Sequence, residues 1–240
     1  MTYCVAAAVG AGIVFASDSR TNAGVDQVAT FSKMNVFEAP DERVVVLLSA
    51  GNLAMTQSVM SLLRQRAKGK HGVLREKSLF DVATQVGDTL REVTTRDGAT
   101  LAQQNIDPSC NFIVGGQIEG ETPRLFHVYP QGNFIETTRD TLYFQIGETK
   151  YGKPIIDRVI KFDTPMKDVA KCLLVSFDST MRSNLSVGLP IDLLGYEKDS
   201  LRVTLKRRFD EEDAYFRSIS QVWSAGLRKA FLDVPDVSWT

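Results

Sequence analysis

The sequence has little of several residue types on which recognisable sites are usually built. Its 240 residues include three cysteines and two histidines, and they contain no CxxC pair. No apolar run approaches the ~18 residues that a transmembrane helix requires, so we expect no membrane partner. The N-terminus also lacks a basic stretch followed by an apolar core, which argues against a secretory signal. Reduced thiols in a cytoplasmic protein fit this cysteine usage best.

Charge of neither sign is in excess. The formal net charge is −1, from 28 lysine and arginine residues and 29 aspartate and glutamate residues. Because nucleic-acid surfaces usually carry a clustered basic excess and the basic residues here are scattered, we expect no nucleic-acid partner. His71 and His127 are isolated from each other, so we expect no zinc or other metal site.

Familiar catalytic signatures are also missing. The chain has no phosphate-cradling GxxxxGK[ST] loop, no GxGxxG after a strand, no HExxH and no GxSxG. A Ser-His-Asp triad would have to use one of the two isolated histidines. These absences direct attention to the N-terminus, where a different kind of nucleophile can arise.

Hydrophobic periodicity predicts blocks of strands that alternate with blocks of helices. Apolar runs typical of strands occupy residues 3–9, 13–16, 34–38, 44–48, 112–114, 125–128, 134–137, 142–146, 191–196 and 201–205. Helical spacing occupies about 52–69, 78–98, 154–160, 166–181 and 211–231. No linker rich in Pro, Gly or Ser occurs, so we expect one domain over residues 1–240. Blocks of strands and helices favour two packed sheets with helices outside, a layered α+β domain.

The second predicted helix has clear signals at both ends. Ser78 is placed to act as its N-cap, with Asp81 three residues later. Gly98 is a natural stop, because glycine commonly follows the last turn of a helix.

Thr2 is the first candidate for a reactive residue. Methionine aminopeptidases remove Met1 before small residues, which would leave Thr2 with a free α-amino group. A hydroxyl is a weak nucleophile without a base. The α-amine has an unperturbed pKa of roughly 7.7–8.0, so it is partly neutral at cytoplasmic pH and lies on the same residue. Threonine at this position is common in cytosolic chains, so it carries weight only together with other features.

An acidic strand end and a lysine supply the next features. Residues 17–20, which read Ser-Asp-Ser-Arg, close the second predicted strand, and the first hairpin would bring Asp18 back toward the chain start. Lys33 lies on a strand-like stretch from 31 to 34. A buried carboxylate would keep this lysine charged, and a nearby ammonium lowers the pKa of an α-amine by like-charge repulsion. Each feature alone also fits an ordinary turn or an edge-strand charge.

A third feature is the junction between a predicted buried strand and the first predicted helix. Residues 49–52 read Ser-Ala-Gly-Asn at this junction. Backbone N–H groups at a helix N-terminus are free donors that suit a developing oxyanion, and Gly51 would let a substrate backbone approach closely. A simple strand-to-helix turn is the alternative interpretation.

These features occur together in a known family. A Thr at the chain start, "ASDSR" at a strand end, a lysine about fifteen residues further on and "SAG" entering a helix resemble the proteasome β subunits and their bacterial relatives. The stretches "GIVFASDSRTNAGVD", "TFSKM" and "RSNLSVGLPIDL" are similar to the bacterial ancestral β subunits, called Anbu, and the resemblance covers most of the chain. It implies a four-layer αββα sandwich of the N-terminal-nucleophile hydrolase type.

The resemblance also implies roles for individual residues. It makes Thr2 the nucleophile and its α-amine the base, with Asp18 and Lys33 as the charged pair beside it. Gly51 would supply the oxyanion amide, and Arg20 would brace the aspartate turn.

Two departures from the family pattern concern the groups around the terminal amine. Ser186 falls where the family has a serine that hydrogen-bonds the amine. The family usually has an aspartate three residues before that serine, where this chain has Ser183. A serine usually follows the glycine after the strand predicted at 142–146, where this chain has Glu148, which could replace the missing acidic partner.

The implied activity is hydrolysis of peptide or related amide bonds through an acyl-enzyme, without a cofactor. The resemblance also places Thr21, Ser49 and Leu53 in the substrate pocket. The relatives assemble into rings, and a ring-like or open helical homo-oligomer is expected here. Two alternatives stay open: a narrow amidohydrolase or isopeptidase, and a non-catalytic assembly scaffold, which the departures at Ser183 and Glu148 favour.

Overall fold

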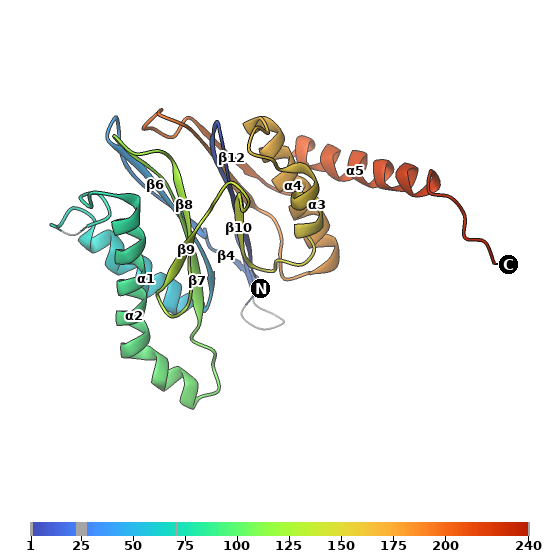
Figure 1. The fold of residues 1–240 in the computed structure, drawn as a ribbon. Helices are drawn as coiled ribbons and strands as arrows, with labels where there is room; N and C mark the ends of the chain where they lie inside the picture. The colour runs from blue at the N-terminus through green and yellow to red at the C-terminus, as the bar shows by residue number, and fades with distance from the viewer. Residues whose placement is uncertain (1, 23–27, 71, 240) are drawn as a thin grey trace.

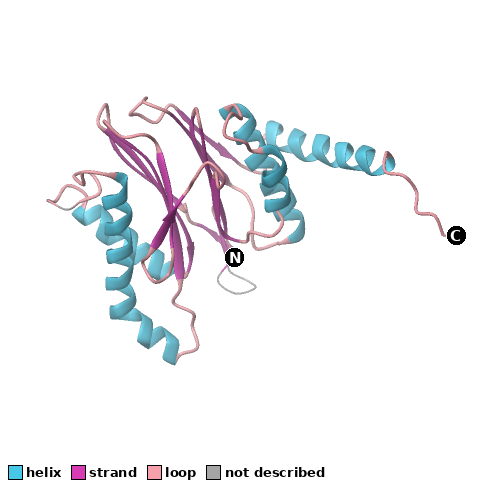
Figure 2. Cartoon of the chain, in the orientation of Figure 1, coloured by secondary structure: helices cyan, strands magenta, loops and turns pink. Residues whose placement is uncertain are grey.

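The polypeptide folds into four layers, with two β-sheets between two layers of helices (Figure 1). A computed structural model describes residues 2–22, 28–70 and 72–239. Figure 2 shows the sheets face to face with helices on both outer sides. The helices are α1 (Leu53–Arg66) and α2 (Leu79–Gln103) on one side, and α3 (Lys153–Val159), α4 (Met166–Ser183) and α5 (Ala214–Leu232) on the other. The predicted αββα sandwich is therefore confirmed.

The first sheet carries the start of the chain near its centre. Its strand order is β10-β1-β2-β11-β12, and all neighbours are antiparallel. The register pairs Cys4 with Ser17, so the start of β1 and the end of β2 lie at the same edge. Asp18 is thereby returned to the chain start, as the sequence predicted. The five strands are β1 (Tyr3–Val9), β2 (Gly12–Asp18), β10 (Tyr143–Gly147), β11 (Ile191–Glu197) and β12 (Leu205–Phe209).

The second sheet is also antiparallel, in the order β5-β6-β7-β8-β9. A short separate hairpin, β3 with β4, leaves the first sheet after Asp18 and leads toward the second. This hairpin was not among the predicted strands. The bounds are β3 (Arg20–Asn22), β4 (Val28–Thr30), β5 (Met34–Ala39), β6 (Arg43–Gly51), β7 (Cys110–Ile118), β8 (Arg124–Val128) and β9 (Phe134–Glu136).

Three apolar layers hold the sandwich together. One lies between α1, α2 and the second sheet, one between the first sheet and its helices, and one between the two sheets. The central strands are consequently buried on both faces, which explains the continuous apolar run at 44–48. α2 begins as predicted, because the Ser78 hydroxyl accepts a hydrogen bond from the Asp81 amide at 3.1 Å.

Three local predictions were wrong. α2 passes through Gly98 and ends at Gln103, because Leu101 still packs against the apolar layer beneath the helix. The strand predicted at 201–205 lies later, at 205–209, since the chain first turns through Asp199 and Leu201, both at positive φ. Lys33 lies in the loop before β5 and not on a strand.

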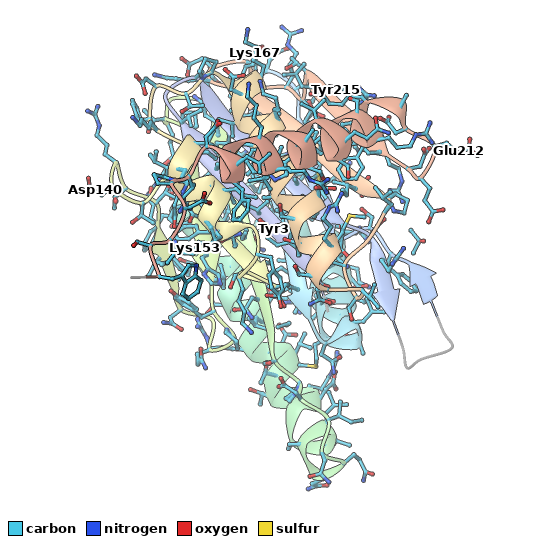
Figure 3. The ribbon with its side chains drawn as sticks, turned by 90° about the vertical axis from the view of Figure 1, so that its right-hand side faces the viewer. Tyr3, Asp140, Lys153, Lys167, Glu212 and Tyr215 are labelled. Carbon is cyan, nitrogen blue, oxygen red and sulfur yellow. The ribbon has the colours of Figure 1, made fainter. Side chains whose placement is uncertain are left out.

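α5 is the most exposed helix of the structure. Figure 3 views the molecule from this side, with α5 crossing in front of the other helices, and Figure 1 shows its end projecting beyond the layers. Phe216 and Ile219 are buried near its start, whereas Val222, Leu227 and Phe231 are exposed along its length. No helix within the described ranges combines the length and apolarity needed to cross a bilayer.

Candidate active site

Thr2 lies directly before β1, where the end of β10 holds its backbone. The Thr2 carbonyl oxygen accepts a hydrogen bond from the Glu148 amide at 2.7 Å. Gly147 pairs with Tyr3 and has φ of +84°, and a Cβ built on it would lie 2.0 Å from the Thr2 carbonyl oxygen. A side chain at position 147 would strain the backbone and displace Thr2, so the position requires glycine.

The residue after Thr2 is anchored at several points. The Tyr3 amide donates to Asp18 Oδ1 at 3.0 Å. The Tyr3 hydroxyl lies 3.0 Å from Ser176 Oγ and accepts a hydrogen bond from Gln145 Nε2 at 2.7 Å. Tyr3, labelled in Figure 3, is fully buried, so Thr2 is attached to a rigid part of the first sheet.

Lys33 and Asp18 form a buried ion pair beside the chain start. Lys33 Nζ donates to Asp18 Oδ1 at 2.7 Å and to the Arg20 carbonyl oxygen at 2.6 Å. Burial raises the pKa of the Asp18 carboxyl, and the neighbouring Lys33 opposes that shift. Since the same carboxylate also accepts the Tyr3 amide, it fixes the lysine relative to the first residues of β1.

Backbone hydrogen bonds position the loop that carries Lys33. The Ser49 amide donates to the Lys33 carbonyl oxygen at 3.0 Å, which ties this loop to the end of β6. The β3–β4 hairpin provides the path by which the chain travels from Asp18 to Lys33, and the Phe31 amide donates to the Ser19 carbonyl oxygen at 2.9 Å. The lysine is therefore placed by tertiary contacts and not by strand geometry.

Gly51 lies at the last position of β6, exposed on the same side as Thr2. Its φ is +114°, and a Cβ there would lie 2.4 Å from the Ser109 carbonyl oxygen. Two amides after Gly51 already donate hydrogen bonds within the protein. The Asn52 amide donates to the Ser109 carbonyl oxygen, and the Met55 amide donates to the Asn52 side chain, which caps α1. The prediction of free donors at this helix start therefore does not extend to the Asn52 and Met55 amides.

A small pocket brings most of the predicted residues together. Its volume is about 150 Å³, and its lining includes Thr2, Thr21, Lys33, Ser49, Gly51 and Leu53. Thr21 Oγ1 is buried, with no hydrogen-bond partner in the part of the chain that the structure describes. Thr21 thus brings a hydroxyl without a described partner to the wall of the pocket.

The loop after α4 lies near the chain start, through contacts with Arg20 and Glu148. Arg20 Nη1 donates to the Leu185 carbonyl oxygen at 3.3 Å, and the guanidinium of Arg20 packs against Gly188. The half-buried Ser186 lies in this loop, and its amide donates to the Asn184 side chain at 2.9 Å. Arg20 thus links the β3 strand to the loop, in addition to receiving Lys33 on its carbonyl oxygen.

Sequence reasoning missed Asn184. Ser183, which stands where the family has an aspartate near the amine, is exposed at the end of α4, whereas Asn184 is buried. Asn184 Nδ2 donates to Glu148 Oε2 at 2.9 Å, and Glu148 is the residue whose amide holds Thr2. A single asparagine after a helix has no recognisable pattern, so nothing local in the sequence identified this contact.

His127 takes no part in this arrangement. His127 lies on β8, with Nε2 3.3 Å from Asn111 Oδ1, and burial lowers its pKa. His71 and Met1 lie outside the described residues.

Comparisons with known proteins agree with this geometry. Residues 2–189 match the family described as "Proteasome subunit". Among solved structures, the chain is similar to Anbu (ancestral beta-subunit) from Yersinia bercovieri, with 50% identity, a TM-score of 0.93 and complete coverage of both chains. No match was found among the curated proteins that were searched.

Two further structures show the same degree of likeness. A helical assembly of the Anbu complex from Pseudomonas aeruginosa has 52% identity and a TM-score of 0.95, with 99% of each chain covered. An Anbu mutant from Hyphomicrobium sp. strain MC1 has 50% identity and a TM-score of 0.93, over 99% of this chain and 100% of that chain. Together with the family match over most of its length, these similarities show that the chain belongs to the proteasome subunit family, among its ancestral β subunits.

Proposed function

We propose that this protein is an N-terminal threonine hydrolase that cleaves peptide or related amide bonds after removal of Met1. The observation that carries the proposal is the buried Lys33–Asp18 pair, which shares the Asp18 carboxylate with the backbone amide directly after Thr2. A buried ion pair is seldom favourable for stability compared with apolar residues of the same size. Its position one residue from the potential nucleophile supports a chemical role.

In the proposed reaction, the Thr2 hydroxyl attacks the carbonyl carbon of the scissile amide. The α-amine of Thr2 accepts the hydroxyl proton and delivers it to the leaving amine as the C–N bond breaks. Water then hydrolyses the resulting ester, which releases the acid and restores the hydroxyl. The Gly51 amide would donate to the negatively charged oxygen that develops on the substrate.

The positive charge of Lys33 favours the neutral form of the α-amine and stabilises negative charge on the threonine oxygen. Asp18 holds Lys33 in place, while Glu148 holds the Thr2 backbone and is itself held by Asn184. Because Glu148 stands where the family usually has serine, we assign it to the support of Thr2 and not to the attack itself.

We further propose that the protein acts as a homo-oligomer in the cytoplasm, where methionine aminopeptidases act. A relative that is 52% identical forms a helical assembly. The apolar side chains exposed on and after α5 support self-association, since soluble monomers rarely expose large contiguous apolar patches. They include Val222, Leu227, Phe231, Leu232 and Trp239.

The test is the intact mass of the purified protein before and after treatment with a peptidyl epoxyketone, beside Thr2→Ala and Thr2→Ser variants. We expect loss of Met1 and one adduct per chain in the native protein and in Thr2→Ser, and no adduct in Thr2→Ala. Cysteines should not compete, because all three are buried. Burial raises the pKa of Cys110 and of Cys172 to about 12, which keeps the nucleophilic thiolate scarce.

Retention of Met1, or an unreactive Thr2 after its removal, would contradict the proposed hydrolase. The non-catalytic scaffold would then be the better account of the fold. A native protein that forms the adduct and cleaves one small amide, but no peptide, would instead indicate the narrow amidohydrolase.

A further inference from the structure

The pocket beside Thr2 has an unusual charge balance. Its lining contains two cationic side chains, Lys33 and Arg64, and none of its described lining residues is aspartate or glutamate. The charge of Lys33 is offset by Asp18 at 2.7 Å. Arg64 is therefore the residue that gives the pocket its net positive charge.

Arg64 lies in the last turn of α1, with its guanidinium held on the pocket side. Its Nη2 donates to the side-chain oxygen of Asn35, which also lines the pocket. No described carboxylate lies within ion-pair distance of Arg64. Arg66, two residues further along the same helix, is instead engaged by Glu92 through two hydrogen bonds of 2.7 and 2.9 Å. The neighbouring arginine thus has its anion among the described residues, and Arg64 has none among them.

The other polar groups of the pocket also suit an entering acceptor. Thr21 Oγ1 is buried at the wall of the pocket, and its hydroxyl proton has no described acceptor. Thr56 has already used its hydroxyl proton on the Leu53 carbonyl oxygen. A carboxylate accepts hydrogen bonds only, and it matches a site with an uncompensated guanidinium and an unpaired hydroxyl.

We propose that this pocket selects substrates with an acidic side chain, aspartyl or glutamyl, on the residue whose carbonyl Thr2 attacks. The inference rests on the proposed threonine hydrolase and specifies its substrate class. The volume of about 150 Å³ lies below the ~300–1,000 Å³ of sites that enclose a whole small molecule, so it fits one side chain of a longer substrate.

The experiment measures the rate at which Thr2 of the full-length protein is modified by four peptidyl epoxyketones. The peptides differ only in the residue next to the epoxyketone, which is Glu, Gln, Leu or Lys, and the adduct is counted by intact mass. Because Arg64 is exposed and its attraction is screened by water, we expect Glu to react only about fivefold faster than Gln. Lys should react more slowly than Gln, since it meets Arg64 as a like charge.

Variants of two arginines on the same helix separate this effect from general charge. Arg64→Gln should remove the difference between Glu and Gln, Arg64→Lys should retain most of it, and Arg64→Glu should make Lys react faster than Glu. Arg66→Gln is the matched control, because it removes the same charge from the same helix outside the pocket. The Arg66→Gln variant should react with the four peptides in the same order as the native protein.

The outcomes distinguish the two proposals. If none of the four peptides modifies Thr2 after loss of Met1, the proposed hydrolase fails, and the substrate class fails with it. If Thr2 reacts but Glu has no advantage, or if the advantage survives Arg64→Gln, the acidic preference is wrong while the hydrolase stands.

Discussion

Two ion pairs of this molecule have the same length and very different surroundings. Lys33 and Asp18 approach to 2.7 Å with side-chain exposures of 8% and 0%. Arg66 and Glu92 also approach to 2.7 Å, with exposures of 45% and 49%. Distance alone therefore says little about what an ion pair contributes. The buried pair is costly to desolvate and is tied to the chain start, whereas water screens the surface pair.

The largest expected effect is that of Lys33→Met. This substitution leaves the buried Asp18 carboxylate without its cation, and we expect a loss of about 3–5 kcal/mol in the free energy of unfolding, measured by urea denaturation. Reactivity of Thr2 toward an epoxyketone should disappear as well. The double variant Asp18→Asn with Lys33→Met should recover much of the stability but none of the reactivity. Recovery of both would mean that the pair only supports the fold.

Gly147→Ala should follow in size, because the new Cβ would collide with the Thr2 carbonyl oxygen. Gly120 is a matched control: its φ is also +84°, but nothing lies within 4 Å of a Cβ placed there. We expect Gly120→Ala to cost about 1 kcal/mol for the left-handed backbone alone, and Gly147→Ala to cost about 1–3 kcal/mol more in urea denaturation. Equal losses in the two variants would contradict a close contact with Thr2.

The contact between Asn184 and Glu148 can be measured by a double-mutant cycle. Each single change to alanine leaves the other polar group buried without this partner, so both should destabilise the protein. We expect a coupling of about 1 kcal/mol between Asn184→Ala and Glu148→Ala in thermal or urea unfolding. Strictly additive losses would show that the hydrogen bond does not connect the α4 end to the residue that holds Thr2.

The smallest effect should be that of Arg66→Gln on the exposed pair. We expect the urea midpoint to stay within experimental error at physiological ionic strength, and any small shift to shrink further in high salt. A large, salt-insensitive loss of stability would show that the comparison between the two pairs is mistaken.

Local patterns in the sequence predicted the layers and the position of Asp18. The alternating apolar residues at 3–9 and the apolar run at 13–16 were sufficient to predict that Asp18 lies beside the chain start. A tight hairpin between these two strands leaves one register that buries both. The N-cap at Ser78 was also predicted correctly from the sequence. Gly98 misled the prediction, because packing of Leu101 outweighs the weak helix propensity of one glycine.

Local sequence patterns predicted less of the candidate site than of the fold. The grouping of Thr2, Asp18, Lys33 and Gly51 came from resemblance to a family, since each residue alone fits an ordinary turn or strand end. Asn184 could not be found in this way, because its partner lies in another loop and neither position forms a periodic pattern. Such contacts depend on how the ends of several strands converge, which sequence spacing does not encode.

The hydrogen bond from the Glu148 amide to the Thr2 carbonyl oxygen also has a consequence for timing during synthesis. Glu148 leaves the ribosome about 150 residues after Thr2, which corresponds to roughly 7–30 s at typical rates of about 5–20 residues per second. Through this interval the first residues of the nascent chain lack the strand that later fixes them. An aminopeptidase can therefore reach Met1 before Thr2 acquires its surroundings, so the order of translation would separate the proposed removal of Met1 from the proposed activity.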